Sequence, residues 1–410
     1  MRFTALIRSA LMLVLLVMAG SASAQELPAG PVRALDGRLL VGGEIVATVG
    51  SEDDEAYYNH TDYDHNALRL FRLALSGEWR VAERVTLVGE LRSENIDTLT
   101  PHAAYIRIRP WIGRRFDIQA GRIPPVFGAF GRRAYAAHTG PIGYPLAYQY
   151  LTSLRPEAVP ARPDDLLAMR GSGWRASYPV GRAEPGPGVP LVSAFRWDTG
   201  VQAHWASDRA TITGAVTTGT LSSPRVRDNN DGKQVSLRAT VRPLFGLVIG
   251  GSAARGSWLA RDIEMTLPEI RQQKTYAQTA IGADAEYSRD HWVIRAETVW
   301  SRWLLPMAAF SSTTDLPVSA MGTFVEGQYR FTPRVFAAAR IDTLRFSSIS
   351  GILSNGQPTP WDAPVRRLEF AAGYHLQRNL VARIAIQRNR RDHAYVHQRT
   401  LLAAQIAYWF

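Results

Sequence analysis

The residues able to do chemistry in this chain are mainly arginines and carboxylates, because it has no cysteine and only two lysines, Lys233 and Lys274. Without thiols, disulfide frameworks, thiolate zinc sites and cysteine nucleophiles are excluded. The 47 basic residues outnumber the 36 acidic ones, which gives a net charge of +11. An arginine excess suits nucleic acid, acidic lipid headgroups or anionic solutes, so the positions of the arginines must decide.

Motifs for catalysis or metal binding are weak. No Gly-x-Ser-x-Gly nucleophile elbow occurs, and Asp198, His204 and the serines are too dispersed to name a triad. His393 and His397 have helical i, i+4 spacing, but the charged residues before them indicate a loop. The stretch 228–232 resembles the start of a calcium loop, yet Ala239 stands where the bidentate glutamate belongs. We therefore predict no catalytic residues, no metal site and no cofactor.

The N-terminus has the pattern of a secretion signal. Arg2 and Arg8 precede a short apolar core at 11–19, and Ala24 completes a small-x-small cleavage site before Gln25. The apolar core is too short to cross a membrane as a helix, which argues against the alternative of an anchor. We predict export and a mature chain from Gln25, which makes nucleic acid an improbable partner.

The later sequence contains no apolar run that suits a transmembrane helix. The longest uncharged stretch, 134–154, has Gly140, Pro141, Gly143 and Pro145 in its middle, and these residues would break a helix. An inner-membrane helical protein is excluded. The remaining classes are a secreted soluble protein and an outer-membrane barrel.

From residue 68 onward the chain alternates with period 2, in runs of the length that a tilted membrane strand needs. In the run 71–79 the odd positions are apolar or glycine, whereas Arg72 and Glu78 lie on the other face. The runs 292–300 and 195–205 repeat the pattern, the second with Arg196 on its polar face. Aromatic residues gather near the ends of these runs and small residues fill the middle, as in the two aromatic girdles of a barrel in lipid. A large soluble β-protein is the alternative.

Short and long connections alternate along the chain. Tight turns are expected at 81–84, 111–115, 207–209, 243–246, 288–290, 332–334 and 377–379. Longer polar segments are expected at 50–67, 97–101, 123–190, 221–233, 260–274, 304–318, 347–364 and 390–398. Seven turns and eight loops join sixteen strands, with the short turns periplasmic. If 173–180 and the chain on either side of 197–200 were separate strands, the number would be eighteen.

The last residues alternate apolar to the end of the chain, through Ile406, Tyr408 and Phe410. This ending resembles the bacterial outer-membrane porin class, whose members end in an amphipathic strand with a terminal Phe and an aromatic residue two positions earlier. The resemblance implies that Ile406, Tyr408 and Phe410 form a signal for the barrel-assembly machinery. The stretch Gly121 to Gly128 looks like the Gly-x-x-x-x-Pro-x-Phe-Gly motif of the phosphate-selective porin family, whose lysine-rich anion path has no counterpart here.

The segment 123–190 is too long for an ordinary connection, and loops of this size are usually functional or disordered. Its aromatic content argues against disorder. Porins commonly fold such a loop into the barrel, where it narrows the lumen. By that resemblance the loop arginines are constriction candidates: Arg132, Arg133, Arg155, Arg162 and Arg170. The alternative for each is an exposed arginine that faces lipopolysaccharide phosphates.

Charged residues also occupy the inward strand faces. The predicted inward arginines are Arg72, Arg92, Arg107, Arg109, Arg196, Arg295, Arg340, Arg367 and Arg383. The predicted inward acids are Glu90, Glu94, Asp117, Asp284, Glu286, Glu297, Glu326, Asp342 and Glu369. Unpaired arginines would select anions, whereas paired ones would stiffen the wall. Both roles can coexist.

The sequence thus predicts an all-β transmembrane antiparallel barrel of about sixteen strands with a long inward-folding third loop. The expected boundaries are 1–24 for the signal, 25–38 for a periplasmic leader and 39–410 for the barrel. We expect a passive channel for small hydrophilic solutes with anion preference, in contact with outer-membrane lipid and lipopolysaccharide. A lipid-acting barrel enzyme and a structural or adhesive barrel are the alternatives. The oligomeric state stays open, with a homotrimer as one outcome.

Overall fold

The structure, a computed structural model, describes residues 30–53, 57–61, 66–194, 196–226, 232–307, 315–392 and 398–410. Within these ranges no helix combines the length and the apolar content needed to cross a membrane. The predicted signal, with Ala24 and Gln25, lies outside them, as do the 228–231 part of the calcium-like stretch, His393 and His397.

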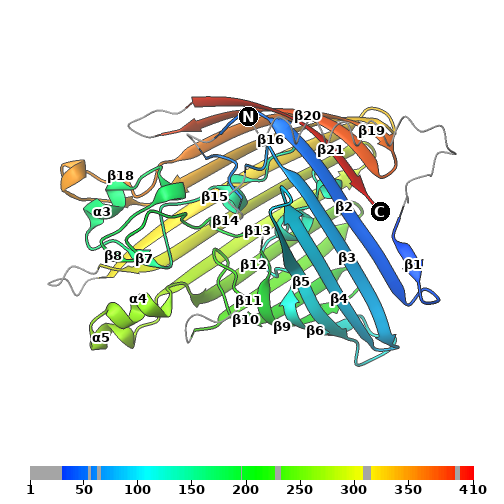
Figure 1. The fold of residues 1–410 in the computed structure, drawn as a ribbon, viewed down its shortest axis with the longest axis horizontal. Coiled ribbons are helices and arrows are strands. Elements are labelled where there is room, and N and C mark those ends of the chain that lie inside the picture. Colours follow the sequence, from blue (N-terminus) through cyan, green and yellow to red (C-terminus); the bar gives the residue numbers. More distant parts are fainter. Residues whose placement is uncertain are drawn as a thin grey trace.

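The described chain forms a closed antiparallel barrel of sixteen strands (Figure 1). In chain order these are β2 Leu39–Gly50, β3 Phe71–Ala82, β4 Val85–Glu94, β5 Thr98–Ile108, β6 Phe116–Ile123, β9 Asp198–Ala206, β10 Ala210–Thr217, β11 Gln234–Leu244, β12 Leu247–Ser257, β13 Ala277–Arg289, β14 Trp292–Pro306, β15 Asp315–Arg330, β16 Val335–Phe346, β19 Val365–Gln377, β20 Leu380–Arg391 and β21 Gln398–Trp409. The barrel closes where β2 pairs with β21, in register from Glu44↔Trp409 to Gly50↔Ala403. The prediction of sixteen strands is confirmed.

One extra strand, β1 Val32–Ala34, pairs with the first residues of β2 from Val32↔Val41 to Ala34↔Leu39. Strand β21 reaches only as far as Glu44 along the same edge. The extra strand therefore covers backbone groups at the start of β2 that β21 leaves open. It lies within the predicted periplasmic leader.

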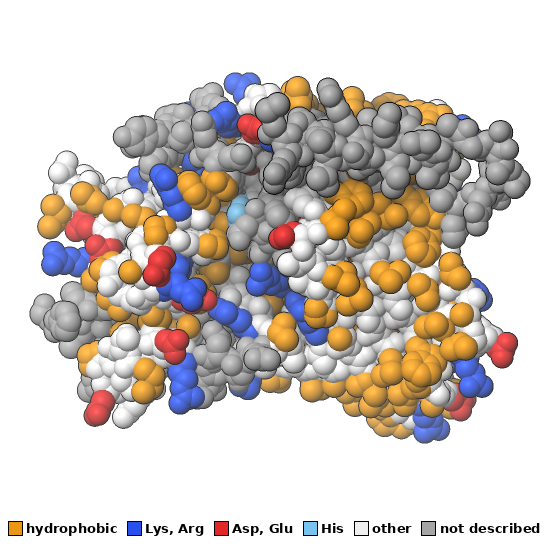
Figure 2. Space-filling model, viewed as in Figure 1, with side chains coloured by type: hydrophobic (Ala, Val, Ile, Leu, Met, Phe, Trp, Pro, Cys, Tyr) orange, Lys and Arg blue, Asp and Glu red, His pale blue; other side chains and the backbone are white. Residues whose placement is uncertain are grey.

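The period of two seen in the sequence separates a lipid-like outer face from a polar lumen. On β3, Leu75 is 51% exposed, whereas Arg72 on the opposite face is buried. On β14, Trp292 and Ile294 are exposed and Glu297 is buried. Figure 2 shows apolar side chains spread over the outer wall and charged side chains gathered toward the two ends. This division confirms the predicted faces of both runs.

Short turns lie at one end of the barrel and long connections at the other, as Figure 1 shows. The long end carries the short helices α3 Pro163–Ala168, α4 Arg261–Thr266 and α5 Glu269–Gln272. It also carries the two-stranded pieces β7 Ala158–Val159 with β8 Val180–Gly181, and β17 Ser348–Ile349 with β18 Thr359–Pro360. The short 3-10 turns are η1 Gly131–Arg133, η2 Ala136–His138, η3 Gly173–Arg175 and η4 Ile352–Ser354.

Three predicted boundaries were wrong. Residues 95–97 form a tight turn between β4 and β5, and Asn95 and Ile96 take positive φ angles there, so 97–101 is not a long loop. Strands β14 and β15 continue pairing to Pro306↔Asp315, so much of 304–318 belongs to the wall. Strand β9 begins at Asp198, which leaves Arg196 and Trp197 in the preceding loop.

The third loop, residues 124–197 between β6 and β9, folds into the barrel, as predicted from the porin resemblance. Its helix α2 Leu146–Gln149 is wholly buried. The largest apolar cluster joins loop residues such as Phe130 and Tyr148 to wall residues such as Trp303 and Leu344. The core of this protein therefore lies inside the barrel, because the loop brings apolar side chains into the lumen.

Candidate channel interior

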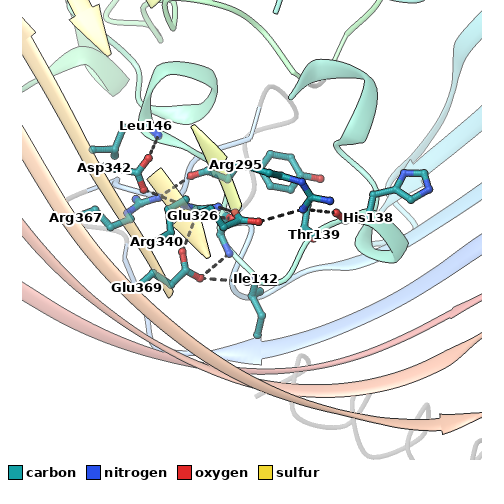
Figure 3. Close-up of polar contacts among 12 residues, drawn as sticks. His138, Thr139, Ile142, Leu146, Arg295, Glu326, Arg340, Asp342, Arg367 and Glu369 are labelled. Atoms are coloured by element: carbon teal, nitrogen blue, oxygen red, sulfur yellow. Dashed lines mark hydrogen bonds and ion pairs between the residues drawn. The ribbon is translucent and has the colours of Figure 1, made fainter. Parts of the chain in front are cut away.

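The third loop is held against one half of the wall by a buried charge cluster (Figure 3). Arg340 on β16, with 0% of its side chain exposed, lies 2.6 Å from Glu369, 3.0 Å from Asp342 and 3.4 Å from Glu326. It also donates a 2.7 Å hydrogen bond to the carbonyl oxygen of Gly143 in the loop. The single positive charge of Arg340 is smaller than the combined negative charge of the three carboxylates around it. N–H groups of the loop backbone donate further hydrogen bonds to these carboxylates.

Two of those carboxylates accept from the loop backbone. Glu369 accepts from the N–H groups of Gly143 at 2.9 Å and Ile142 at 3.2 Å. Asp342 accepts from the N–H of Leu146, at the start of α2, at 3.4 Å. The cluster thus fixes the loop main chain to β16 and β19.

Other predicted pore arginines anchor the loop by donating to it. Arg367 donates to the carbonyl oxygens of Tyr144 and Tyr58 at 2.9 and 2.8 Å, and Arg383 donates to those of Ala136 and Thr139. Both side chains are buried, and the terminal guanidinium nitrogens of each donate to backbone carbonyl oxygens, which offsets part of the cost of burial. These arginines lie on the lumen face, as predicted, but their guanidinium groups bind the third loop.

The neighbouring part of the wall, beyond the closure between β21 and β2, also holds the loop, through tyrosines. Arg72 on β3 pairs with Glu94 at 2.7 Å and donates to the Tyr144 hydroxyl at 2.8 Å. On β4, Arg92 pairs with Glu90 at 2.9 Å, and Glu90 accepts from the Tyr135 hydroxyl at 2.8 Å. Arg72 and Arg92 are buried, so structural pairing describes them better than a water-facing pore position.

The glycine motif at 121–128 starts the loop. Gly121 and Gly128 take φ angles of +127° and +72°, a region that favours glycine. A side chain at Gly128 would overlap the Tyr148 hydroxyl and the carboxylate of Glu297. Glu297 accepts from that hydroxyl and from the N–H groups of Ala129 at 3.3 Å and Phe130 at 3.2 Å. The motif permits the close approach of the loop to β14.

An acidic side chain at the long-loop end holds the outer part of the third loop. Asp362, between β18 and β19, accepts from the N–H groups of Ser153 at 2.8 Å and Gly171 at 2.7 Å. Burial raises the pKa of this carboxyl, and the backbone donors partly oppose that rise. No sequence pattern predicted this contact, because Asp362 lies in a polar loop far along the chain.

Some predicted constriction residues lie elsewhere. Arg155 is buried within the loop and donates to the carbonyl oxygens of Ala176 and Glu184, both at 2.8 Å. Arg162 is exposed at the start of α3, and α3 contacts η4 at the long-loop end, while Arg170 is half-buried after the same helix. Arg109 is exposed beyond the end of β5, and Arg196 is exposed before β9. Arg109 and Arg196 are therefore not on strand faces, because their strands stop short of them.

Arg132 is a predicted arginine that lines two cavities inside the barrel. Its guanidinium is anchored by a 2.9 Å bond from Nε to the Pro125 carbonyl oxygen, and the side chain is exposed. It lines a cavity of about 400 Å³ that reaches the short-turn end at Trp409 and Arg330. It also lines a second cavity of about 300 Å³ beside Tyr105 on β5. Arg132 therefore lies between these two cavities.

The larger cavity, which we call the vestibule, is strongly basic. It is lined by Arg132, Arg133, Arg295, Arg330 and Arg383, by His138 and His375, and by one carboxylate, Glu286. Glu286 pairs with Arg295 at 2.8 Å and with Arg133. Glu286 is the one carboxylate in this lining, against five guanidiniums, so the lining carries a net positive charge. Sequence reasoning missed Arg330, His138 and His375 because turn position and loop folding bring them here.

The second cavity lies between third-loop residues, such as Pro124 and Tyr135, and the wall strands β5, β6 and β9. Its lining includes Gln119 on β6 and Gln202 and His204 on β9, and their neighbours Arg107 and Asp117 are half-buried. Arg107 pairs with Glu78, and Asp117 accepts from Gln119 at 2.7 Å. Arg107 and Asp117 are half-buried, whereas the inward residues Arg340 on β16 and Glu369 on β19 are fully buried. The second cavity therefore runs beside β5, β6 and β9.

Solved structures of known proteins share this architecture. OmpT of Vibrio cholerae in its trimer form superposes with a TM-score of 0.52 at 10% identity, over 91% of this chain and 99% of that one. The anion-selective porin of Comamonas acidovorans gives 0.54 at 7% identity, over 91% and 99%. The channel DcaP of Acinetobacter baumannii gives 0.54 at 9% identity, over 93% and 100%.

The barrel has the porin fold. No protein-family model and no curated protein sequence match the chain. In the described part of the chain, no three His, Asp or Glu side chains gather as a metal site.

Proposed function

We propose that the protein is a porin-type channel of the bacterial outer membrane that passes small hydrophilic solutes and prefers anions. The observation that carries the proposal is the exposed Arg132 between the vestibule and the second cavity. A solute that moves through the open side of the barrel must pass its guanidinium. Because the loop fills the opposite half of the lumen, the passage is narrow.

The structural neighbours support this proposal through their fold. They include an outer-membrane channel and an anion-selective porin, and one solved form of OmpT is a trimer. We extend these properties to this chain as proposals: outer-membrane location after export, anion preference and a homotrimer. The basic vestibule supports the second of these independently of the neighbours.

Planar-bilayer recording tests the function. The purified barrel should give stable ohmic steps, and the reversal potential across a salt gradient should have the sign of anion preference. Cation preference would contradict the role of the vestibule while leaving the channel intact. A closed barrel that hydrolyses phospholipid would instead support the lipid-acting enzyme.

A further inference from the structure

A groove of about 470 Å³ lies on the outer face of the barrel at the short-turn end. The turns that follow β5 and β9 form it, and its lining includes Trp111, Arg114, Arg115, Phe116, Trp205 and Asp208. No part of the channel interior uses these residues. Figure 2 shows apolar side chains gathered at the lower right of the wall, with basic and acidic side chains at the adjoining edge.

The groove has an aromatic side that faces away from the lumen. Phe116 and Trp205 are paired across β6 and β9, on the face opposite to the inward Asp117 and His204. Trp111 packs against Phe116 with ring centroids 5.3 Å apart. Trp111 is 52% exposed and Trp205 is 44% exposed. Exposed indole rings at the end of a barrel wall suit the boundary between hydrocarbon and headgroups.

The other side of the groove is basic. The guanidinium of Arg114 lies 5.8 Å from the ring centre of Trp111. Arg115 pairs with Asp208 at 2.6 Å, but both side chains are largely exposed, so this pair is weak and can exchange partners. The exposed Arg209 follows Asp208, and its carbonyl oxygen accepts from the N–H of Arg242, which is also exposed.

Basic residues outnumber acids in the neighbourhood of the groove. Asp208 is the one acidic residue in the lining, against Arg114 and Arg115. Two guanidiniums can bind the oxygens of a phosphate monoanion, while the aromatic side receives the start of an acyl chain. The position at the short-turn end, opposite the long loops, favours a glycerophospholipid over lipopolysaccharide, which occupies the outer leaflet.

We propose that this groove binds one anionic phospholipid of the periplasmic leaflet, with its phosphate on Arg114 and Arg115 and its chain along Trp111 and Trp205. The location of the leaflet rests on the outer-membrane placement in the proposed function. The binding itself does not rest on channel activity. Binding at this rim would fix the depth of the barrel in the membrane.

Native mass spectrometry of the full-length barrel in detergent tests the proposal with phosphatidylglycerol and phosphatidylcholine as probes. Wild type should retain one phosphatidylglycerol per chain at concentrations at which phosphatidylcholine is lost. Arg114→Gln/Arg115→Gln should weaken retention of phosphatidylglycerol at least tenfold, since each arginine near a membrane surface contributes about tenfold or somewhat less. The matched control is Arg334→Gln/Arg378→Gln, which removes two exposed arginines from other turns of the same rim.

Retention that is unchanged in the groove variant, or lowered equally in the control variant, would overturn the proposal. Equal retention of the two lipids by wild type would do the same, because it would remove the role of headgroup charge. Displacement of phosphatidylglycerol by excess inorganic phosphate would assign the site to free phosphate and also overturn it. The groove variant should keep wild-type conductance, so failure here is distinguishable from failure of the channel proposal.

Discussion

Arg340 and Glu369 bind the two backbone polar groups of one loop residue, Gly143. Their side chains lie 2.6 Å apart in the barrel interior, Arg340 donates to the carbonyl oxygen of Gly143, and Glu369 accepts from the N–H of the same residue. A wall ion pair thereby becomes part of the loop anchor. From the sequence, these charged residues could line the pore or stiffen the wall. In the structure, Arg340 and Glu369 bind the third loop by hydrogen bonds.

Arg340→Ala should loosen the third loop. The change leaves Glu326, Asp342 and Glu369 buried without their shared cation, which costs about 3 to 5 kcal/mol. We expect a lower unfolding temperature in heat-modifiability gels and a larger, noisier conductance. Arg345→Ala, at an exposed position of the same strand, is the control and should resemble wild type. Unchanged conductance in Arg340→Ala would show that the cluster does not hold the loop.

Arg132→Glu should reduce or reverse anion preference, because it replaces the cation between the two cavities with an anion. The reversal potential across a tenfold salt gradient measures the effect. Arg162→Glu makes the same charge change at an exposed site beside the long loops and should shift the potential much less. Equal shifts in the two variants would mean that overall charge, and not the passage, sets selectivity.

Gly128→Ala should interfere with the docking of the third loop on β14. The added carbon would overlap the Tyr148 hydroxyl and Glu297, and the φ of +72° is strained for alanine. Limited trypsin digestion should cut after Arg133, which precedes Ala134 and is half-buried in the wild-type loop. Gly77→Ala adds the same carbon where the nearest atoms are more than 4 Å away, and should remain resistant.

Asp53, in the loop between β2 and β3, should make stability depend on pH. Burial raises its pKa to about 6, although it accepts from the N–H of Asn59 at 2.8 Å. Because the folded protein binds this proton more tightly than the unfolded chain does, stability should fall as pH rises from about 4 to 6. A rise of about two units corresponds to about 3 kcal/mol.

The Asp53→Asn variant isolates this contribution. The difference in unfolding temperature between wild type and variant should favour wild type most at pH 4, decline through pH 6 and stay constant above pH 7. A difference that does not change between pH 4 and 8 would contradict a raised pKa.

Phe410 should contribute to barrel assembly in two separable ways. Its N–H and carbonyl groups exchange hydrogen bonds of 3.0 and 3.1 Å with Gly43, which help to close the barrel. Phe410→Ala keeps these bonds and removes only the ring, whereas deletion of Phe410 removes both. If the ring is the assembly signal, both variants should lower the folded fraction recovered from outer membranes. Normal assembly of Phe410→Ala would restrict the role of the residue to closure.

The alternation of apolar and polar residues determined the strands, their faces and the short turns. Successive side chains of a strand point to opposite faces, so the local sequence is enough to place Leu75 on the outer face and Arg72 on the inner face. The prediction that Arg109 and Arg196 lie on strand faces was wrong, because the alternation of residues does not determine where a strand begins or ends.

What each inward charge does was decided only by the tertiary structure. Arg340 and Arg132 are both arginines predicted for the interior, yet one is enclosed by three carboxylates and a loop carbonyl and the other faces two cavities. Burial and partners depend on how the third loop crosses the lumen. That path is set by contacts between residues far apart in the chain, such as Asp362 with Ser153 and Glu297 with Tyr148, which no local pattern encodes.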